Sequence, residues 1–437
     1  MINPGLAGVL PRGTTCSPEG HLVVGGCDAI ELTQRFGTPL IVLDRGTFEA
    51  KARAFGAALD PERVYYAGKA FLCVAVCELL ADLGLGLDVC TEGELATAVR
   101  AGFPSDRIVF HGNNKSSSEL EHAGRSGVGR VVVDSLEEIA RLEGAGLRTR
   151  LLLRMTPGVE AHTHEFVQTG REDSKFGFTV SERSTIEAVR TALRVSGCEV
   201  VGLHAHIGSQ IFELAAYDLA IRRLAEFAAV CQSDAGFTPR ELNLGGGLGV
   251  AHTRDETTPE PVEWIHRSQR AVAREFTAHG LEPPVLAVEP GRAMVGQAAV
   301  TLYRVGTVKR IPGVRTYASV DGGMSDNIRP ALYGARYEAF LANRVNDRLG
   351  PRVAVVGKHC ESGDVLVPDV HLPEDVAAGD LLCIPATGAY TYSMASNYNR
   401  VPRPTVVMVK SGRAVEIVAR ETHEDLLRLD RHLNGSS

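Results

Sequence analysis

The chain has 437 residues, of which 44% are hydrophobic and 23% are charged, and its formal net charge is −7. This composition is typical of a globular protein of two or three domains and unlike that of a disordered or fibrous chain. The net negative charge argues against nucleic acid as a main ligand.

The N-terminal stretch MINPGLAGVLPRG has no cationic segment followed by an apolar run. No uncharged apolar run reaches the roughly 18 residues that a membrane span needs. Nine cysteines, an odd number without a CxxC pair, indicate reduced thiols rather than a disulfide framework or a zinc ribbon. We therefore expect a soluble cytoplasmic protein without a membrane partner, in which most cysteines are small buried side chains.

Short apolar runs recur along the chain, each followed by a turn and a stretch of helical periodicity. This alternation indicates a parallel sheet covered by helices on both faces, and eight such units are the number that closes a TIM (β/α)8 barrel. A doubly wound open sheet is the alternative. The runs are Val64–Ala67, Leu85–Val89, Ile108–Phe110, Val131–Val133, Leu151–Met155, Val200–Ala205, Glu241–Leu244 and Val285–Val288.

The pattern changes after the predicted barrel, which extends from residue 42 to 297. Alternating strands with Gly and Pro turns and little helix indicate a second, mainly β domain resembling a β-barrel or sandwich. Residues 1–41 precede the barrel and contain a β-like piece at Leu22–Val24, so we expect them to join residues 298–437 in this domain. Its clearest strands are Val300–Val308, Thr316–Val320, Val353–Val356 and Thr405–Val409.

Residues with reactive side chains or glycines follow the successive apolar runs. Because the C-terminal strand ends of a TIM barrel share one rim, we expect these residues to converge. They are Lys69, Asp88, His111, Asp134, Arg154, His206, Gly245 to Gly247 and Glu289.

Lys69, in YYAGKA, follows the first predicted strand. A lysine in this position is most often a solvated surface residue, but an amine in a partly desolvated pocket has a lowered pKa and can form a Schiff base with a carbonyl. The loop Leu242–Gly249, LNLGGGLG, follows the seventh strand, where TIM barrels commonly bind phosphate. A tight turn without a ligand explains that loop equally well, and the loop does not fit GxGxxG.

The string EPGR comprises Glu289, Pro290, Gly291 and Arg292 at the end of the eighth strand. A local ion pair is its simplest explanation. However, a buried glutamate at this point could hold a proton on a pyridine nitrogen, and an arginine could bind an anion. Together with Lys69 and the glycine loop, this acid completes the contacts to aldehyde, phosphate and ring nitrogen that pyridoxal 5′-phosphate needs.

Two His-x-His pairs, His204 with His206 and His162 with His164, favour a rival interpretation. Such pairs bind metals on TIM barrels and would suggest a metal-dependent hydrolase. No third and fourth ligands are evident at the strand ends, so we predict no metal site. We favour His206 as a flat ring stacked on a cofactor, with Ser209 donating to the cofactor's phosphate.

Cys360, in HCESGD, has ionisable residues on both sides, a setting that suits a proton donor. A buried core cysteine is the equally weighted alternative. Arg329 and Tyr333, in DNIRPALYG, and Tyr390, in GAYTYSMASNYN, lie in turns that could present anion-binding groups. Turn chemistry alone also explains the composition of these segments.

Together these motifs resemble the diaminopimelate decarboxylases of the alanine-racemase-like (fold type III) pyridoxal phosphate enzymes. The resemblance extends in order over about residues 65–399, through the strings YYAGKA, HTHEFVQTGREDSKFGF, HAHIGSQ, GGGLG, EPGR, DNIRPALYG, CESGD and GAYTYSMASNYN. It implies decarboxylation of meso-diaminopimelate to L-lysine, with pyridoxal 5′-phosphate as cofactor, in a homodimer.

The resemblance also implies a role for each site residue. Lys69 carries the cofactor as a Schiff base, His206 stacks on its ring, Glu289 pairs with its nitrogen, and Cys360 is the proton donor. The other implied cofactor contacts are Asp88 and Arg154 on the oxygen side, Ser209, Gly245, Gly246, Gly247 and Tyr390 on the phosphate, and Pro290, Gly291 and Arg292. The implied substrate contacts are Arg292, Arg329, Tyr333, Glu361 and Tyr390. In this family the cysteine and the following glutamate reach the active site of the partner subunit, so the β domain is expected to complete that site.

Three residues depart from the family pattern. Thr156 stands where an Asn is common, and Lys358 and His359 stand where a Gly-Pro pair is common. None of these departures removes a group that the chemistry requires.

Two alternatives to this substrate and activity remain open besides the metal hydrolase. An ornithine- or arginine-type decarboxylase of the same fold would share Lys69, Glu289 and Cys360. A distal carboxylate requires cationic partners, so Arg292 with Arg329 favours diaminopimelate. A non-catalytic binding homologue would be expected to lose the lysine or the cysteine, and both are present.

Overall fold

The computed structural model describes residues 4–159, 174–182 and 184–433. The chain forms two compact units, which we name the barrel unit and the β unit. The barrel unit consists of Lys51–Val250 and Thr258–Met294, and the β unit of Met1–Ala50, Ala251–Thr257 and Val295–Ser437. Within the described part of the chain, no helix combines the length and the apolar character that crossing a membrane requires.

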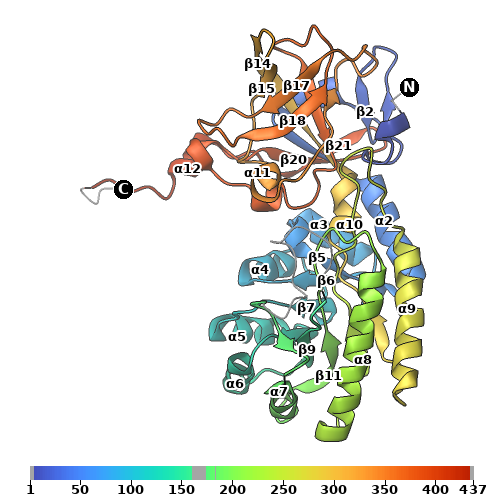
Figure 1. Ribbon diagram of the computed structural model, residues 1–437. Helices are drawn as coiled ribbons and strands as arrows, with labels where there is room; N and C mark the ends of the chain where they lie inside the picture. The colour runs from blue at the N-terminus through green and yellow to red at the C-terminus, as the bar shows by residue number, and fades with distance from the viewer. Residues whose placement is uncertain (1–3, 160–173, 183, 434–437) are drawn as a thin grey trace. The chain divides into compact units, whose positions relative to one another are not determined.

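The barrel unit is an eight-stranded parallel barrel, as predicted (Figure 1). Its strands pair in the order β13-β12-β11-β9-β8-β7-β6-β5, and a parallel bridge between Val64 and Val288 joins the two ends of this series. The Tyr65 N–H donates to the Val288 carbonyl oxygen at 2.9 Å, so the ring of strands is closed and the open-sheet alternative is wrong. The strands are β5 (Tyr65–Ala67), β6 (Gly86–Val89), β7 (Ile108–Phe110), β8 (Arg130–Val133), β9 (Arg150–Thr156), β11 (Glu199–His204), β12 (Glu241–Asn243) and β13 (Val285–Ala287), with β10 (Phe178–Thr179) paired to β9 outside the ring.

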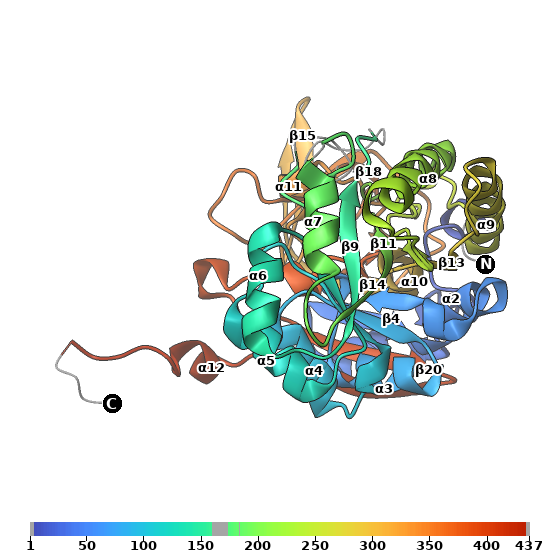
Figure 2. The same ribbon diagram turned by 90° about the horizontal axis from the view of Figure 1, so that it is seen from below.

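Helices between the strands surround the barrel, as Figure 2 shows. Their ends carry ordinary capping signals: Ser116 and Glu119 form a capping box at the start of α5, and Gly127 ends that helix with a left-handed φ of 71°. The helices are α2 (Arg45–Ala58), which begins in the β unit, α3 (Val74–Asp82), α4 (Glu92–Arg100), α5 (Ser117–Ser126), α6 (Leu136–Ala145), α7 (Ser184–Ala192), α8 (Ala215–Ala235), α9 (Pro261–Ala278) and α10 (Arg292–Val295).

An apolar cluster fills the middle of the barrel, and polar residues lie above it along the same strands. The cluster contains Tyr65, Val109, Val132, Leu152, Val201 and Ala287. Side chains on one face of a strand recur every second residue. The next inward positions after Val109, Val132, Leu152 and Ala287 are therefore His111, Asp134, Arg154 and Glu289, all of them buried.

The β unit contains a nine-stranded sheet with the order β18-β17-β15-β14-β4-β20-β21, and β19 pairs with both β14 and β16. All four predicted C-terminal strands are present, as β14, β15, β17 and β20. The strands of this sheet are β4 (Leu40–Asp44), β14 (Ala299–Ile311), β15 (Arg315–Val320), β16 (Phe340–Leu341), β17 (Arg352–Val356), β18 (Val365–His371), β19 (Leu381–Pro385), β20 (Thr405–Lys410) and β21 (Arg413–Val418). The helices of this unit are α1 (Ala29–Phe36), α11 (Arg329–Tyr333) and α12 (His423–Leu427).

The N-terminal region supplies the strand β4, which lies between β14 and β20. The Leu22–Val24 piece forms β2, which pairs instead with β1 (Thr15–Cys16) and β3 (Cys27–Asp28) in a separate three-stranded sheet. The predicted boundary at residue 42 falls inside β4. The barrel unit begins at Lys51 because all of β4 pairs with strands of the β unit.

Candidate active site

Glu289 follows β13 and is 3% exposed. The Nε2–H of His111 and the Nδ2–H of Asn243 each donate to its Oε1 at 2.8 Å, and the Nε2–H of His204 donates to its Oε2 at 3.1 Å. Burial by itself raises the pKa of Glu289, but the two imidazoles hold that pKa well below its ordinary value. The carboxylate is therefore ionised, and its Oε2, with one donor from the described residues, can accept a further N–H.

His204 ends β11, and burial lowers its pKa to about 4. The ring is therefore neutral near pH 7, with its proton on the Nε2 that faces Glu289. Its Nδ1 is buried and has no hydrogen-bond partner among the described residues.

His111, His204 and Glu289 place three metal-type donor atoms within 4.8 Å of one another, all on buried side chains. This cluster contains His204 but not His206, so it does not complete the predicted His204–His206 pair as a set of metal ligands. Among the described residues this cluster has three members. The other pair, His162 and His164, lies outside the described residues.

Lys69 is connected to Glu289 through two intervening side chains. Its Nζ lies 3.9 Å from Oδ2 of Asp88, and Oδ1 of Asp88 lies 3.7 Å from the His111 Nε2 that donates to Glu289. Burial raises the pKa of Asp88, while His111 and Lys69 oppose that rise. Oδ2 of Asp88 has no hydrogen-bond partner in the described part of the chain. The amine and the acid predicted to contact one cofactor thus lie at the same rim.

The three glycines after β12 pack too closely for side chains. A Cβ on Gly246 would lie 2.3 Å from the carbonyl oxygen of Glu289, and a Cβ on Gly247, whose φ is 100°, would lie 2.4 Å from that of Gly208. The Gly246 N–H donates to Nδ1 of His206 at 3.3 Å. Desolvation lowers the pKa of His206 well below its usual value, so that Nδ1 is an acceptor. The three glycines therefore let this loop pack directly on the backbone of Glu289 and Gly208 at the rim.

The turn that contains Pro290 and Gly291 packs on the first strand of the barrel. The Ala67 N–H donates to the Pro290 carbonyl oxygen at 3.4 Å, and a Cβ on Gly291 would lie 3.0 Å from Ala67. Arg292 donates from Nη2 to Oγ of Ser209 at 3.1 Å. The last strand of the barrel therefore positions its arginine beside the serine that was predicted to bind phosphate.

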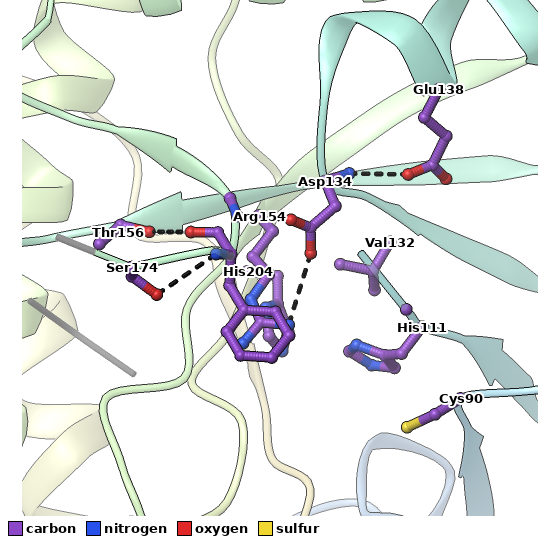
Figure 3. Close-up of polar contacts among 12 residues, drawn as sticks. Cys90, His111, Val132, Asp134, Glu138, Arg154, Thr156, Ser174 and His204 are labelled. Carbon is purple, nitrogen blue, oxygen red and sulfur yellow. Dashed lines mark hydrogen bonds and ion pairs between the residues drawn. The ribbon is translucent and has the colours of Figure 1, made fainter. Parts of the chain in front are cut away.

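Arg154, in β9, forms a buried ion pair with Asp134, with 3.5 Å between Nη1 and Oδ2 (Figure 3). Its guanidinium lies 4.2 Å from the centre of the Phe176 ring. Burial lowers the pKa of Arg154, while the charge of Asp134 opposes this effect. Thr156, one of the departures, donates to the Phe176 carbonyl oxygen at 2.5 Å. Asp134, Arg154 and Thr156 thus fix the segment around Phe176 against the strand ends.

The remaining predicted residues belong to the β unit. Arg329, in α11, is buried and donates from Nη1 to Nε2 of His252 at 3.0 Å and to the Tyr337 hydroxyl. Its Nε has no hydrogen-bond partner among the described residues. Tyr333 and Tyr390 are half-buried, and Tyr390 has a left-handed φ of 59°. Such a backbone is uncommon for a bulky residue and often marks a functional position.

All nine cysteines are free thiols. Cys360 is exposed, and so is the neighbouring Glu361, so the core alternative for this cysteine is wrong. Four of the other eight are buried as expected, whereas Cys16, Cys73, Cys90 and Cys198 are half-buried.

The sequence did not identify Asn243 as a site residue, and it did not predict that His111 and His204 would bind the carboxylate of Glu289. The available signal was their position at strand ends next to predicted site residues. Partners around Arg329, namely His252 and Tyr337, were also missed, and no local motif marks them.

Comparisons with known proteins agree with this geometry. Residues 45–296 match the family described as "Pyridoxal-dependent decarboxylase, pyridoxal binding domain". The chain is 47% identical over 420 residues to the diaminopimelate decarboxylase of Bacillus subtilis, covering 94% of this chain and 95% of that relative.

Among solved structures, the diaminopimelate decarboxylase of M. jannaschii in co-complex with L-lysine superposes with a TM-score of 0.89 at 32% identity, covering 97% of this chain and 99% of that one. The Helicobacter pylori enzyme, also complexed with L-lysine, gives a TM-score of 0.83 at 30% identity, covering 92% of this chain and 98% of that one. The chain therefore belongs to the diaminopimelate decarboxylase family of pyridoxal-dependent decarboxylases.

Proposed function

We propose that this chain uses pyridoxal 5′-phosphate to decarboxylate meso-diaminopimelate to L-lysine, with Lys69 and Glu289 as its two main cofactor contacts. The observation that carries this assignment is the connection between an amine and an ionised, buried carboxylate through Asp88 and His111. The activity in the names of the relatives agrees with this chemistry.

The residues at the rim fit the cofactor. Oε2 of Glu289 can accept one more N–H, and Oδ2 of Asp88 is buried without a hydrogen-bond partner among the described residues. When bound, pyridoxal 5′-phosphate supplies an electron sink for the pair of electrons that remains after carbon dioxide leaves.

The chain's own residues orient the reactants and handle protons. Lys69 holds the cofactor aldehyde through its amine, and the ionised Glu289 keeps a proton on the ring nitrogen. His206 covers one face of the ring, and the glycine loop with Ser209 binds the phosphate. Cys360 returns a proton to the substrate's Cα.

The distal end of the substrate carries both an ammonium and a carboxylate, so it requires groups of both signs. Arg292, Arg329 and Tyr333 suit the carboxylate, and Glu361 suits the ammonium. Tyr390 contributes to substrate and phosphate binding. We propose that Cys360 and Glu361 act in the active site of the partner subunit of a homodimer.

The test is a comparison of substrates. Purified protein with added pyridoxal 5′-phosphate is incubated with meso-diaminopimelate, ornithine or arginine, and carbon dioxide and the amine products are measured. We expect lysine from the first substrate and little product from the other two. Turnover of ornithine or arginine in preference to diaminopimelate would reassign the substrate. Loss of activity with a chelator, together with resistance to borohydride, would support a metal enzyme instead.

A further inference from the structure

His359 lies where three loops of the β unit meet. Its Nε2 is 2.8 Å from the Ser325 hydroxyl and its Nδ1 is 3.2 Å from the side-chain oxygen of Asn399. The imidazole is buried, and its centre lies 5.3 Å from that of the Tyr398 ring. The three loops are those next to Arg329, around Cys360 and after Tyr390, so each lies close in sequence to a proposed site residue.

The hydrogen-bond roles around His359 follow from the backbone of Cys360. The Cys360 N–H, which can only donate, points at the side-chain oxygen of Asn399 at 3.3 Å. That oxygen also faces Nδ1 of His359, so Nδ1 carries the proton. Nε2, on the other side of the ring, faces the Ser325 hydroxyl, which can donate or accept. Both ring nitrogens of His359 therefore have a hydrogen-bond partner.

The backbone on both sides of the imidazole is held as well. The carboxylate of Asp364 accepts the His359 N–H at 2.9 Å and the Met324 N–H at 2.6 Å. Asn399 has a left-handed φ of 52°, a backbone conformation that Asn tolerates better than most residues. Cys360 itself is exposed, so its position depends on these neighbours.

We propose that His359 is a positioning residue for Cys360 and that it acts through the shared oxygen of Asn399. This inference rests on the proposed function, in which Cys360 delivers a proton. A shift of about 1 Å in a reacting group can lower a rate by about a hundredfold. The departure from the family pattern at position 359 therefore has a defined structural role.

The test compares two substitutions of similar size. His359→Asn places an amide N–H near the position of Nδ1 and keeps the bond to Asn399, whereas His359→Leu removes it. We expect His359→Leu to lower kcat by about ten- to a hundredfold with little change in KM, and His359→Asn to restore most of kcat. If the Leu variant does not fold, His359→Gln replaces it, because Gln offers an acceptor to Ser325 but no donor at the Nδ1 position.

A second measurement does not depend on activity. Hydrogen exchange of the Cys360 backbone amide, followed by mass spectrometry in the holoenzyme, should be faster in His359→Leu and close to wild type in His359→Asn. His371→Asn is the matched control, since this exposed histidine of the same unit binds the Gly350 carbonyl oxygen and should leave both measurements unchanged.

Equal kcat and equal exchange in wild type and His359→Leu would overturn the inference, as would equal losses in the Leu and Asn variants. If the wild type formed no lysine, the proposed function would fail, and the exchange comparison would still decide whether His359 positions Cys360.

Discussion

Nε2 of His111 lies 2.8 Å from Oε1 of Glu289, although 178 positions separate these residues in the sequence. Each residue follows a barrel strand, β7 and β13, at the rim where parallel strands end. The pair keeps a buried carboxylate ionised, because a hydrogen bond from a nearby imidazole favours the charged form of an acid.

Replacing His111 with Leu should make Glu289 less able to keep the ring nitrogen of the cofactor protonated. A hydrogen bond to a charged group contributes about 1.5–3 kcal/mol, so we expect kcat to fall by roughly ten- to a hundredfold. The measurement is steady-state decarboxylation, with circular dichroism to check that the fold persists. His279→Leu, outside this cluster at the end of α9, is the control, and an equal loss in both variants would contradict the assignment.

Replacing Lys69 with Ala should abolish both lysine formation and covalent retention of the cofactor. The reason is that only an amine at this position can bond to the aldehyde. Borohydride reduction followed by peptide mass spectrometry measures the attachment. Lys309→Ala, an exposed residue of β14, should retain both properties. Attachment of the cofactor at another lysine would contradict the assignment of Lys69.

Replacing Gly246 with Ala should impair cofactor binding, although the added methyl group does not change Lys69 or the carboxylate of Glu289. The new Cβ would lie 2.3 Å from the carbonyl oxygen of Glu289, so the loop must shift away from the turn that contains the acid. We expect at least about a tenfold rise in the dissociation constant of pyridoxal 5′-phosphate, measured by absorbance titration. In Gly144→Ala the Cβ on α6 meets no atom within 4 Å, and this variant should bind as the wild type does.

The contribution of His204 to the stability of the protein should fall as the pH is lowered from about 6.5 to 4, whereas Asp326, whose pKa burial raises to about 7, contributes with the opposite sign in this window. Burial lowers the pKa of His204 from 6.5 to about 4, so in this window the unfolded chain binds a proton that the folded chain does not. The contribution of His204 to the free energy of unfolding therefore rises with pH, by about 3 kcal/mol across the window, and is constant above it. The lowered pKa of Glu289 has the same sign and acts below its ordinary value of 4.5.

Denaturant unfolding at several pH values measures this dependence. Relative to wild type, His204→Asn should lower the slope of the free energy of unfolding against pH between pH 4 and 6.5, whereas the exposed His266→Asn should leave that slope unchanged. An unchanged slope in His204→Asn would show that other groups cause the pH dependence.

Local patterns in the sequence were sufficient for the barrel. Each of the eight apolar runs became a strand, because a strand buried on both faces must be apolar along its whole length. The shared rim could be predicted from the topology of a closed parallel barrel. Asp88 lies near the end of β6, and His111 and Glu289 follow β7 and β13, yet the three side chains lie close together.

Pairings between distant segments could not be predicted in this way. The position of β4 between β14 and β20 depends on contacts across most of the chain, and its apolar run looks like a barrel strand when taken alone. Asn243 was missed for a related reason. An amide at a strand end has no distinctive pattern, and its bond to Glu289 becomes visible only when the strands are in register.

The place of β4 also constrains how the protein is synthesised. The backbone of β4 pairs with Leu302 on one side and with Thr405 on the other. This early strand therefore cannot form both of its pairings until the ribosome has made the barrel segment and most of the remaining chain. The barrel segment lies between β4 and β14 in the sequence and can complete its own ring first. Until β20 emerges, the nascent chain carries an apolar edge that other chains or chaperones can bind.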